Sequence, residues 1–258
     1  MELEHRYGPS VHLLSDPYQL SLLARIGSPD TGTELVSGLV RSAYRHLFAQ
    51  VLSRSFPVVE DSVKTRMAAT EPRGVYEGPR FCQRTKLVLC AVIRAGILPA
   101  QICYELACEV LPPANVRIDF LNLSRTTDDD GQVTGVRLDG SNIGGPVDDA
   151  VVVIPDPMGA TGGTIERVVQ IYENIEGGNP RAIAAAHLMV TPEAIQRLVV
   201  SSPSLTLYAG RLDRGLSPPD VLNTTPGSRP DEERGLNDVQ YIVPGAGGMG
   251  ELLTNAWV

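Results

Sequence analysis

The chain has 258 residues, 43% hydrophobic and 20% charged, with a formal net charge of −8 at pH 7 and an isoelectric point near 5.0. This length is enough for a full core, so we interpret residues 1–258 as one domain. The chain is acidic and lacks the clustered Lys and Arg of nucleic-acid binders, which argues against a nucleic-acid partner. We find no signal-peptide pattern at the amino terminus and no run of 18 apolar residues, which predicts a cytoplasmic protein without membrane contact.

The first half of the chain alternates predicted helices and strands. Residues 34–55 place apolar side chains four positions apart, which predicts an amphipathic helix. Residues 58–67 and 74–81 are expected to form short strands around a turn. The continuous apolar run at 87–93 predicts a strand buried on both faces, followed by a helix over 97–111. The apolar face predicted for the first helix contains Leu35, Leu39, Ala43, Leu47 and Val51.

The second half repeats this alternation. Residues 116–124 and 150–156 are predicted strands, and the polar stretch 126–145 between them has the composition of a solvated loop. Alternating strands and helices indicate an α/β fold with a central, mainly parallel sheet flanked by helices. Residues 217–234 are rich in Pro and charge and nearly free of large apolar residues, which predicts an exposed insertion. The remaining predicted elements are helices over 164–175 and 192–200 and strands over 182–190 and 205–210.

The stretch "DPMGATGGT", residues 156–164, joins a predicted buried strand to a predicted helix. A glycine-rich turn at such a junction lets backbone N–H groups converge on an anion, and the helix amino terminus adds partial positive charge. Gly162 and Gly163 can take backbone angles denied to other residues, and Thr161 and Thr164 can donate hydroxyl hydrogens. The same residues also fit a plain helix start capped by Thr, so the glycine and threonine content leaves both interpretations open.

Asp156 strengthens the ligand interpretation, because an acidic group at the end of an apolar strand is costly without a partner. The stretch resembles the phosphoribosyl pyrophosphate (PRPP) loop of the uracil phosphoribosyltransferase family. Four further stretches resemble that family in the same order: "TRMAATEPRGVYEGPRF", "VIRAG", "SRTTDD" and "GLNDVQYIVPGAGG". The resemblance covers roughly residues 15–258. It implies a type I phosphoribosyltransferase fold with a β-arm and a small C-terminal hood.

Carried over by position, the resemblance implies a role for each motif. Arg94 and Arg125 would bind pyrophosphate, and Asp156 would contact the ribose hydroxyls and act as the catalytic candidate. Arginine suits pyrophosphate because its charged fork matches phosphate oxygens. The rest of the PRPP loop would be Pro157, Met158, Gly159, Ala160, Thr161, Gly162, Gly163 and Thr164, with the last five on the 5′-phosphate. The base would be bound by Ile242, Gly247, Gly248 and Met249, largely through main-chain groups.

The activity that the resemblance implies is attack of uracil N1 on C1 of PRPP, which gives UMP and pyrophosphate in pyrimidine salvage. Such a displacement is stabilised by placed charges and Mg²⁺ more than by a nucleophilic side chain. We expect Mg²⁺ to arrive on PRPP without a direct protein ligand. The family also implies a homodimer or higher homo-oligomer, with residues 126–145 as the β-arm.

The C-terminal stretch "PGAGGMGE" departs from the family pattern. Gly248 and Glu251 stand where the family has Asp, and Met249 replaces a small or aromatic residue. Three interpretations therefore stay open: a uracil phosphoribosyltransferase, a phosphoribosyltransferase for a different heterocyclic base, and a non-catalytic PRPP-binding regulatory protein.

Overall fold

The computed structural model describes residues 1–127 and 133–256, and only the backbone of residues 125–127, 133 and 134. The helices are α1 (Pro17–Ile26), α2 (Thr33–Ser55), α3 (Ile97–Cys108), α4 (Gly163–Asn174), α5 (Pro192–Ser201), α6 (Pro219–Leu222) and α7 (Met249–Thr254). The strands are β1 (Val11–Leu13), β2 (Val58–Lys64), β3 (Val75–Phe81), β4 (Lys86–Ile93), β5 (Val116–Thr127), β6 (Val133–Asn142), β7 (Ala150–Pro155), β8 (Met158–Gly159), β9 (Ala182–Val190) and β10 (Leu205–Leu212).

The main sheet has eight strands, in the order β1-β10-β9-β7-β4-β5-β6, with β8 paired to β9. Every pairing in it is parallel except that of β5 with β6. The predicted α/β fold with a mainly parallel sheet is therefore confirmed. The carboxyl ends of β4, β5 and β7 lie at the same edge, where ligands of such sheets collect.

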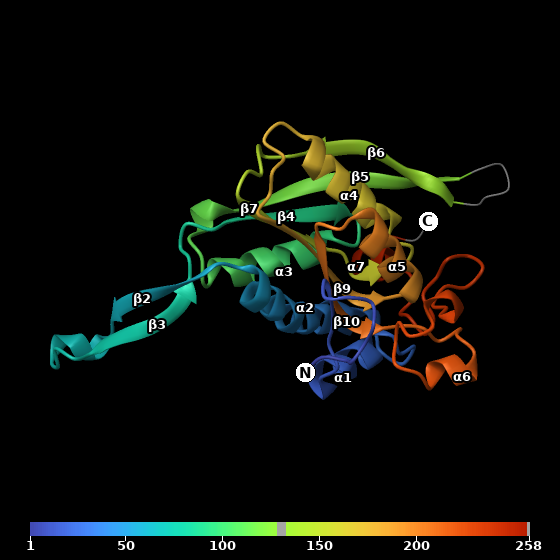
Figure 1. Cartoon of the computed structure of the whole chain (residues 1–258), viewed down its shortest axis with the longest axis horizontal. Coiled ribbons are helices and arrows are strands. Elements are labelled where there is room, and N and C mark those ends of the chain that lie inside the picture. Colours follow the sequence, from blue (N-terminus) through green and yellow to red (C-terminus); the bar gives the residue numbers. More distant parts are fainter. Residues whose placement is uncertain (128–132, 257–258) are drawn as a thin grey trace.

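Helices cover both faces of this sheet (Figure 1). On β4, Leu87 and Leu89 pack with α2 and α3, whereas Val88 and Cys90 pack with α4 and α5. A strand buried on both faces needs apolar residues at every position, which is why "LVLCAVI" lacks alternation. Among the described residues, no helix has both the length and the apolar character needed to cross a bilayer.

The apolar face of α2 differs from the prediction at its first turn. Leu39, Ala43, Leu47 and Val51 are buried, but Leu35 is 48% exposed. A spacing of four drifts around a helix of 3.6 residues per turn, so the first member of the series rotates away from the core.

The polar stretch 126–145 is not wholly the solvated loop that its composition predicts. Residues 133–142 form β6, which pairs antiparallel with β5 at the edge of the main sheet. Backbone hydrogen bonds to one neighbour suffice for an edge strand, so polar side chains do not prevent it. Residues 128–132 lie outside the described part. The antiparallel hairpin that forms a separate sheet is β2–β3, and it projects from the body (Figure 1).

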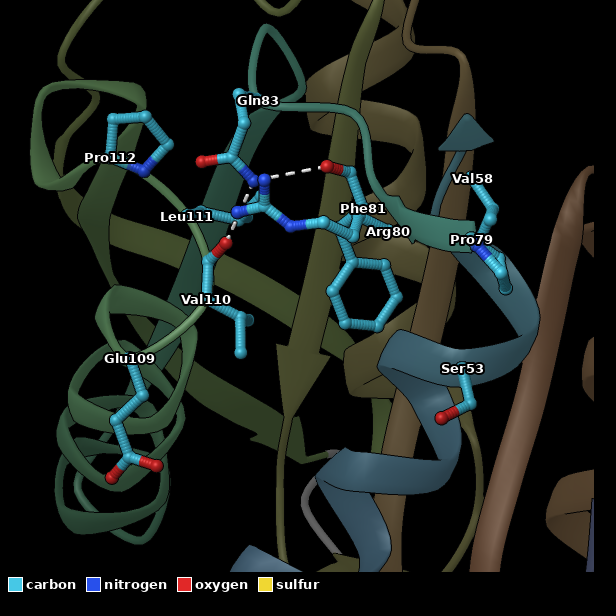
Figure 2. A pocket seen from close by; sticks show the side chains of 10 residues that line it. All are labelled: Ser53, Val58, Pro79, Arg80, Phe81, Gln83, Glu109, Val110, Leu111 and Pro112. Atoms are coloured by element: carbon cyan, nitrogen blue, oxygen red, sulfur yellow. Dashed lines mark hydrogen bonds between the residues drawn. The ribbon is translucent and has the colours of Figure 1, made fainter. Parts of the chain in front are cut away.

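A groove of about 690 Å³ lies where this hairpin meets the carboxyl end of α3 (Figure 2). Phe81 and Val110 line it, and the Gln83 side-chain amide donates to the carbonyl oxygens of both, at 3.0 and 3.1 Å. The groove shares no lining residue with the cleft described below.

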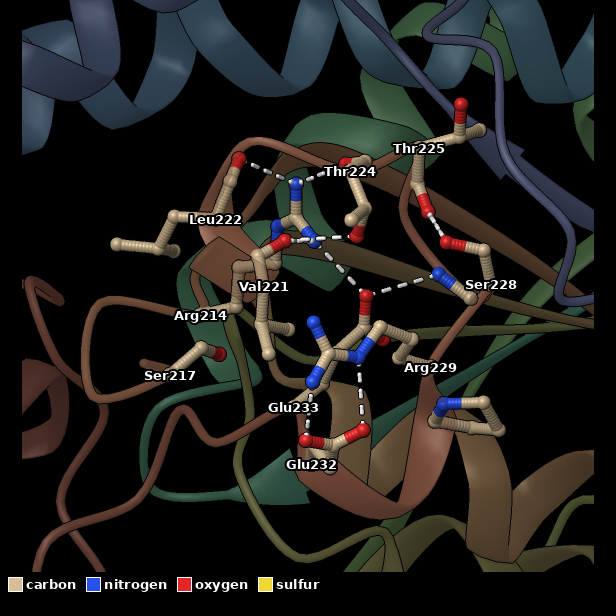
Figure 3. A network of polar contacts seen from close by, with 12 residues as sticks. Arg214, Ser217, Val221, Leu222, Thr224, Thr225, Ser228, Arg229, Glu232 and Glu233 are labelled. Atoms are coloured by element: carbon tan, nitrogen blue, oxygen red, sulfur yellow. Dashed lines mark hydrogen bonds and ion pairs between the residues drawn. The ribbon is translucent and has the colours of Figure 1, made fainter. Parts of the chain in front are cut away.

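Residues 217–234 are more firmly packed than an exposed insertion (Figure 3). Val221 and Glu233 are fully buried, although many neighbouring residues are exposed. The Glu233 carboxylate accepts hydrogen bonds from Arg214 Nη1 at 2.8 Å, from the Gly227 amide at 2.9 Å and from the Tyr7 hydroxyl. Composition misjudged this segment because paired charges, rather than apolar area, hold it in place.

Candidate functional site

The candidate site is a cleft of about 350 Å³ at the carboxyl ends of the central strands. One wall comes from β4, β5 and the segment after β7, and the other from the C-terminal residues 240–251. The cleft brings together residues of three predicted motifs, "VIRAG", "SRTTDD" and "DPMGATGGT", with the C-terminal loop. The predicted residues that line it are Arg94, Asp156, Met158, Ala160, Thr164, Ile242, Gly247, Gly248 and Met249.

The loop after β7 is held against β9 by backbone hydrogen bonds. The Pro157 carbonyl accepts from the Leu188 amide at 3.0 Å, and the Gly159 carbonyl accepts from the Thr191 amide at 3.0 Å. The buried Thr191 hydroxyl also donates to the Ala160 carbonyl at 2.6 Å. Strand-like pairing therefore fixes the shape of this loop.

The same loop ends at the amino terminus of α4. Gly162 is the residue before the helix, its φ is +77°, and no side chain caps the helix there. The structure thus excludes the Thr-capped helix start, and the positive φ explains the glycine. The first N–H groups of a helix have no partner inside the helix, so those at Gly163 and Thr164 remain for a ligand.

His187 supports this loop from β9. Its Nδ1 lies 2.6 Å from the Asp156 carbonyl oxygen, and since a carbonyl only accepts, Nδ1 carries the proton. Complete burial lowers the pKa of His187 to about 4, so the ring is neutral at pH 7. A Cβ at Gly159 would approach this ring to 3.0 Å, which explains glycine at that position.

Arg94 lies in the turn between β4 and α3. The turn is tight, because a Cβ on Gly96 would approach the backbone of Val92 to 2.8 Å. The Arg94 side chain is partly exposed. Its Nη1 donates to the Ala256 carbonyl at 2.9 Å, and its Nη2 lies 3.3 Å from Glu251 Oε1. The C-terminal segment therefore lies next to this arginine.

The sequence marks Glu251 only as a departure from the family's Asp, whereas the structure places it in the site. Its carboxylate lies where a Cβ on Gly248 would be, so Glu251 fills the space next to this glycine. Asp156 and Glu251 both line the cleft. The sequence spacing could have indicated that Glu251 lies beside Gly248. Glu251 follows Gly248 by three residues in a helical segment, and residues three apart are neighbours on a helix surface.

The C-terminal wall is a hairpin-like loop. Ile242 pairs with Leu236 through a single β-bridge. Ile242 and Met249 are 6% and 2% exposed, so their side chains pack into the core, and both residues also line the cleft. Gly247 has a φ of +72°. Tyr241 also lines the cleft and was not predicted.

Some predicted residues do not line the cleft. The backbone of Arg125 is on β5 opposite Val136, which does line it, but the side chain of Arg125 is outside the described part. Five other predicted residues belong to the loop after β7 but do not line the cleft: Pro157, Gly159, Thr161, Gly162 and Gly163.

Asp156 and Glu251 are the two carboxylates among the described residues that line the cleft. Within the described ranges, no cluster of three or more His, Cys, Asp or Glu residues could hold an ion by itself. The two cleft carboxylates instead fit the usual mode of Mg²⁺, which takes one or two carboxylates together with substrate phosphates.

The fold and cleft define an α/β protein of the phosphoribosyltransferase type. The solved structure of the AQ2163 protein from Aquifex aeolicus superposes with a TM-score of 0.72 at 22% identity, covering 96% of this chain and 99% of that one. The sequence profile of the uracil phosphoribosyltransferase family matches residues 13–228, and the chain belongs to this family. The uracil phosphoribosyltransferase of Mycoplasmoides gallisepticum is 23% identical over 239 residues, 93% of this chain and 95% of its own length. That of Aquifex aeolicus is 27% identical over 174 residues, 67% of each.

Proposed function

We propose that the protein is a uracil phosphoribosyltransferase, which converts uracil and PRPP to UMP and pyrophosphate. The observation that carries the proposal is one cleft that unites the uncapped start of α4, Arg94 and the main chain of residues 240–248. Family membership supports the PRPP half of the reaction. The matched residues end at 228, before the C-terminal wall, so the choice of base depends on the cleft.

Each group in the cleft has a distinct task in this proposal. The amides at the start of α4 hold the 5′-phosphate, and Asp156 accepts hydrogen bonds from the ribose hydroxyls. Arg94 exchanges Glu251 for pyrophosphate and stabilises the charge that develops on it. Mg²⁺ bound to PRPP, beside Asp156 and Glu251, would supply further charge neutralisation.

The base is held by the main chain of the C-terminal wall. Fixed peptide N–H and C=O groups can match the alternating acceptors and donors of a pyrimidine ring and lose little entropy on binding. Gly248 in place of the family's Asp favours a second candidate, a phosphoribosyltransferase for another heterocycle, because the carboxylate beside this position comes from Glu251 instead.

The test is incubation with PRPP, Mg²⁺ and a panel of bases, followed by detection of nucleoside monophosphate and pyrophosphate. UMP formation supports the proposal. If another base is turned over and uracil is not, the second candidate function is supported instead. PRPP binding without turnover of any base would instead indicate a non-catalytic regulatory protein.

Arg94→Ala provides the matching site test. We expect PRPP affinity to fall roughly tenfold to a hundredfold, equivalent to about 1.5–3 kcal/mol for charged hydrogen bonds, with folding intact. Arg80→Ala is the control, since Arg80 pairs with Asp61 on the β2–β3 hairpin and does not line the cleft. Unchanged calorimetric affinity in Arg94→Ala would remove Arg94 from the site.

We also propose a homodimer or higher homo-oligomer in the cytoplasm. The β2–β3 hairpin is a separate two-stranded sheet, which is marginally stable alone in water, and it exposes Val58, Met67 and Tyr76. Light scattering on the intact chain and on Met67→Glu would test this assembly.

A further inference from the structure

Two Arg-x-Asp pairs hold loop glycines through similar hydrogen bonds. At the end of β10, Arg211 Nε and Nη2 donate to the two oxygens of Asp213 at 2.5 and 2.7 Å. Asp213 Oδ2 accepts from the Gly245 amide at 2.8 Å, and Arg211 Nη2 donates to the Gly245 carbonyl at 3.3 Å. One ion pair thus holds both polar groups of a single glycine.

The second pair is on β5. Arg117 Nε and Nη2 donate to Asp119 at 3.0 and 3.3 Å, and Asp119 accepts from the Gly144 amide at 3.0 Å. Arg117 Nη2 also donates to the Gly145 carbonyl at 2.8 Å. The side chains of Asp119 and Asp213 are each 1% exposed, so the two aspartates are matched in burial, although Asp119 also accepts from the Tyr172 hydroxyl at 3.0 Å.

The pairs differ in what they hold. Gly144 and Gly145 line no part of the cleft, whereas Gly245 precedes Gly247 and Gly248, which do. The amino-terminal end of the same hairpin is anchored in a similar way, since Glu193 accepts from the Gly235 amide at 2.9 Å. Two carboxylates therefore hold the chain on both sides of residues 236–244.

We infer that Asp213, oriented by Arg211, is a positioning residue for base binding. Recognition by main-chain groups requires their directions to be set before the base arrives, because a peptide group cannot adjust as a side chain does. Asp213 sets the direction of Gly245 and hence of the two peptide units that follow. This inference rests on the proposed function, because it assumes that the base binds to the main chain of residues 240–248.

The first test compares Asp213→Asn with Asp119→Asn in the full chain by amide hydrogen exchange, which needs no substrate. Asp213→Asn should speed exchange in residues 241–249 and leave 142–147 unchanged, and Asp119→Asn should do the reverse. Equal exchange at 241–249 in both variants would overturn the inference.

The second test is kinetic. In Asp213→Asn we expect KM for the base to rise at least about tenfold, the factor that corresponds to 1.4 kcal/mol, with KM for PRPP within about twofold. Asp119→Asn should shift neither constant by more than about twofold, although both variants lose stability. A parallel rise of both KM values in Asp213→Asn would show a merely structural role.

Failure of the proposed function remains distinguishable. If the wild type forms no UMP, the proposed function fails, while the exchange comparison still decides whether Asp213 positions the loop. If Asp213→Asn does not fold, Arg211→Lys and Arg117→Lys replace the pair of variants. Lysine keeps the charge but loses the two-pronged contact, so the same reciprocal exchange pattern is expected.

Discussion

The two walls of the cleft are held in place by different means. The wall that we propose binds the phosphate, residues 155–164 (the phosphate half), is held against β9 mainly by backbone hydrogen bonds, with His187 and Thr191 as side-chain supports. The wall that we propose binds the base, together with its supports, residues 213–251 (the base half), contains little regular structure and depends on side-chain carboxylates such as Asp213 and Glu233. Backbone pairing does not depend on which side chains are present, whereas a side-chain anchor is lost when its residue is substituted. The phosphate half should therefore tolerate changes that loosen the base half.

The largest expected effect is in the base half. Glu233→Gln leaves Arg214 without its buried partner, which costs about 3–5 kcal/mol of unfolding free energy. Burial and the hydrogen bond to Glu233 also raise the pKa of Tyr7, so its hydroxyl stays a donor at neutral pH. Urea unfolding measures the loss.

The exposed neighbour serves as the control for that change. Glu232 pairs with Arg229 at the surface, and Glu232→Gln should shift stability by less than about 1 kcal/mol. Where Glu233→Gln remains folded, its calorimetric PRPP affinity should match the wild type. A large loss of PRPP affinity would contradict the independence of the two halves.

His187 predicts a pH dependence that belongs to the phosphate half. Burial lowers its pKa from 6.5 to about 4. Between pH 6.5 and 4, His187 is therefore protonated in the unfolded chain but neutral in the folded protein. The stability from the neutral ring is present above pH 6.5 and is lost as the pH falls toward 4, by roughly 3 kcal/mol in total. His187→Gln, which can still donate to Asp156 but does not titrate, should flatten this dependence in urea unfolding. Identical pH slopes would refute the assignment.

Thr191→Val removes one side-chain support of the phosphate half. The hydroxyl bonds both Ala160 and the Ala194 amide at the start of α5, so we expect a loss of about 1–2 kcal/mol and weaker PRPP binding. Thr65→Val is a matched control, because Thr65 caps a turn on the β2–β3 hairpin. PRPP affinity that falls equally in both variants would contradict this role.

The smallest effect on stability is expected from Glu251→Gln. Its ion pair with Arg94 is partly exposed, so the unfolding free energy should change by less than about 1 kcal/mol. Without divalent cations, pyrophosphate should bind about 1 kcal/mol more tightly, roughly fivefold, since a competing negative charge is gone. Isothermal titration of pyrophosphate measures this, and weaker binding would contradict the proposed exchange at Arg94.

The two halves also differ in how well the sequence predicted them. The phosphate loop combines a buried strand, a glycine that needs positive φ and a helix start, and these lie within one stretch of residues, so its shape could be predicted. The family resemblance also assigned Arg94 and Ile242 to the site, and both residues line the cleft. The packing of residues 217–234 could not be predicted, because composition shows the charge of Glu233 but not its burial against Arg214.

The sequence by itself determined the parallel sheet, the glycine-rich turn after Asp156 and membership in the family, because periodicity and contiguous motifs act over short distances along the chain. Only the tertiary structure decided that Glu251 lies beside Gly248 and Arg94, and that Asp213 holds Gly245. The contacts of Glu251 with Arg94 and of Asp213 with Gly245 join segments that are separated in sequence, and the direction of a side chain becomes defined only when the elements pack together.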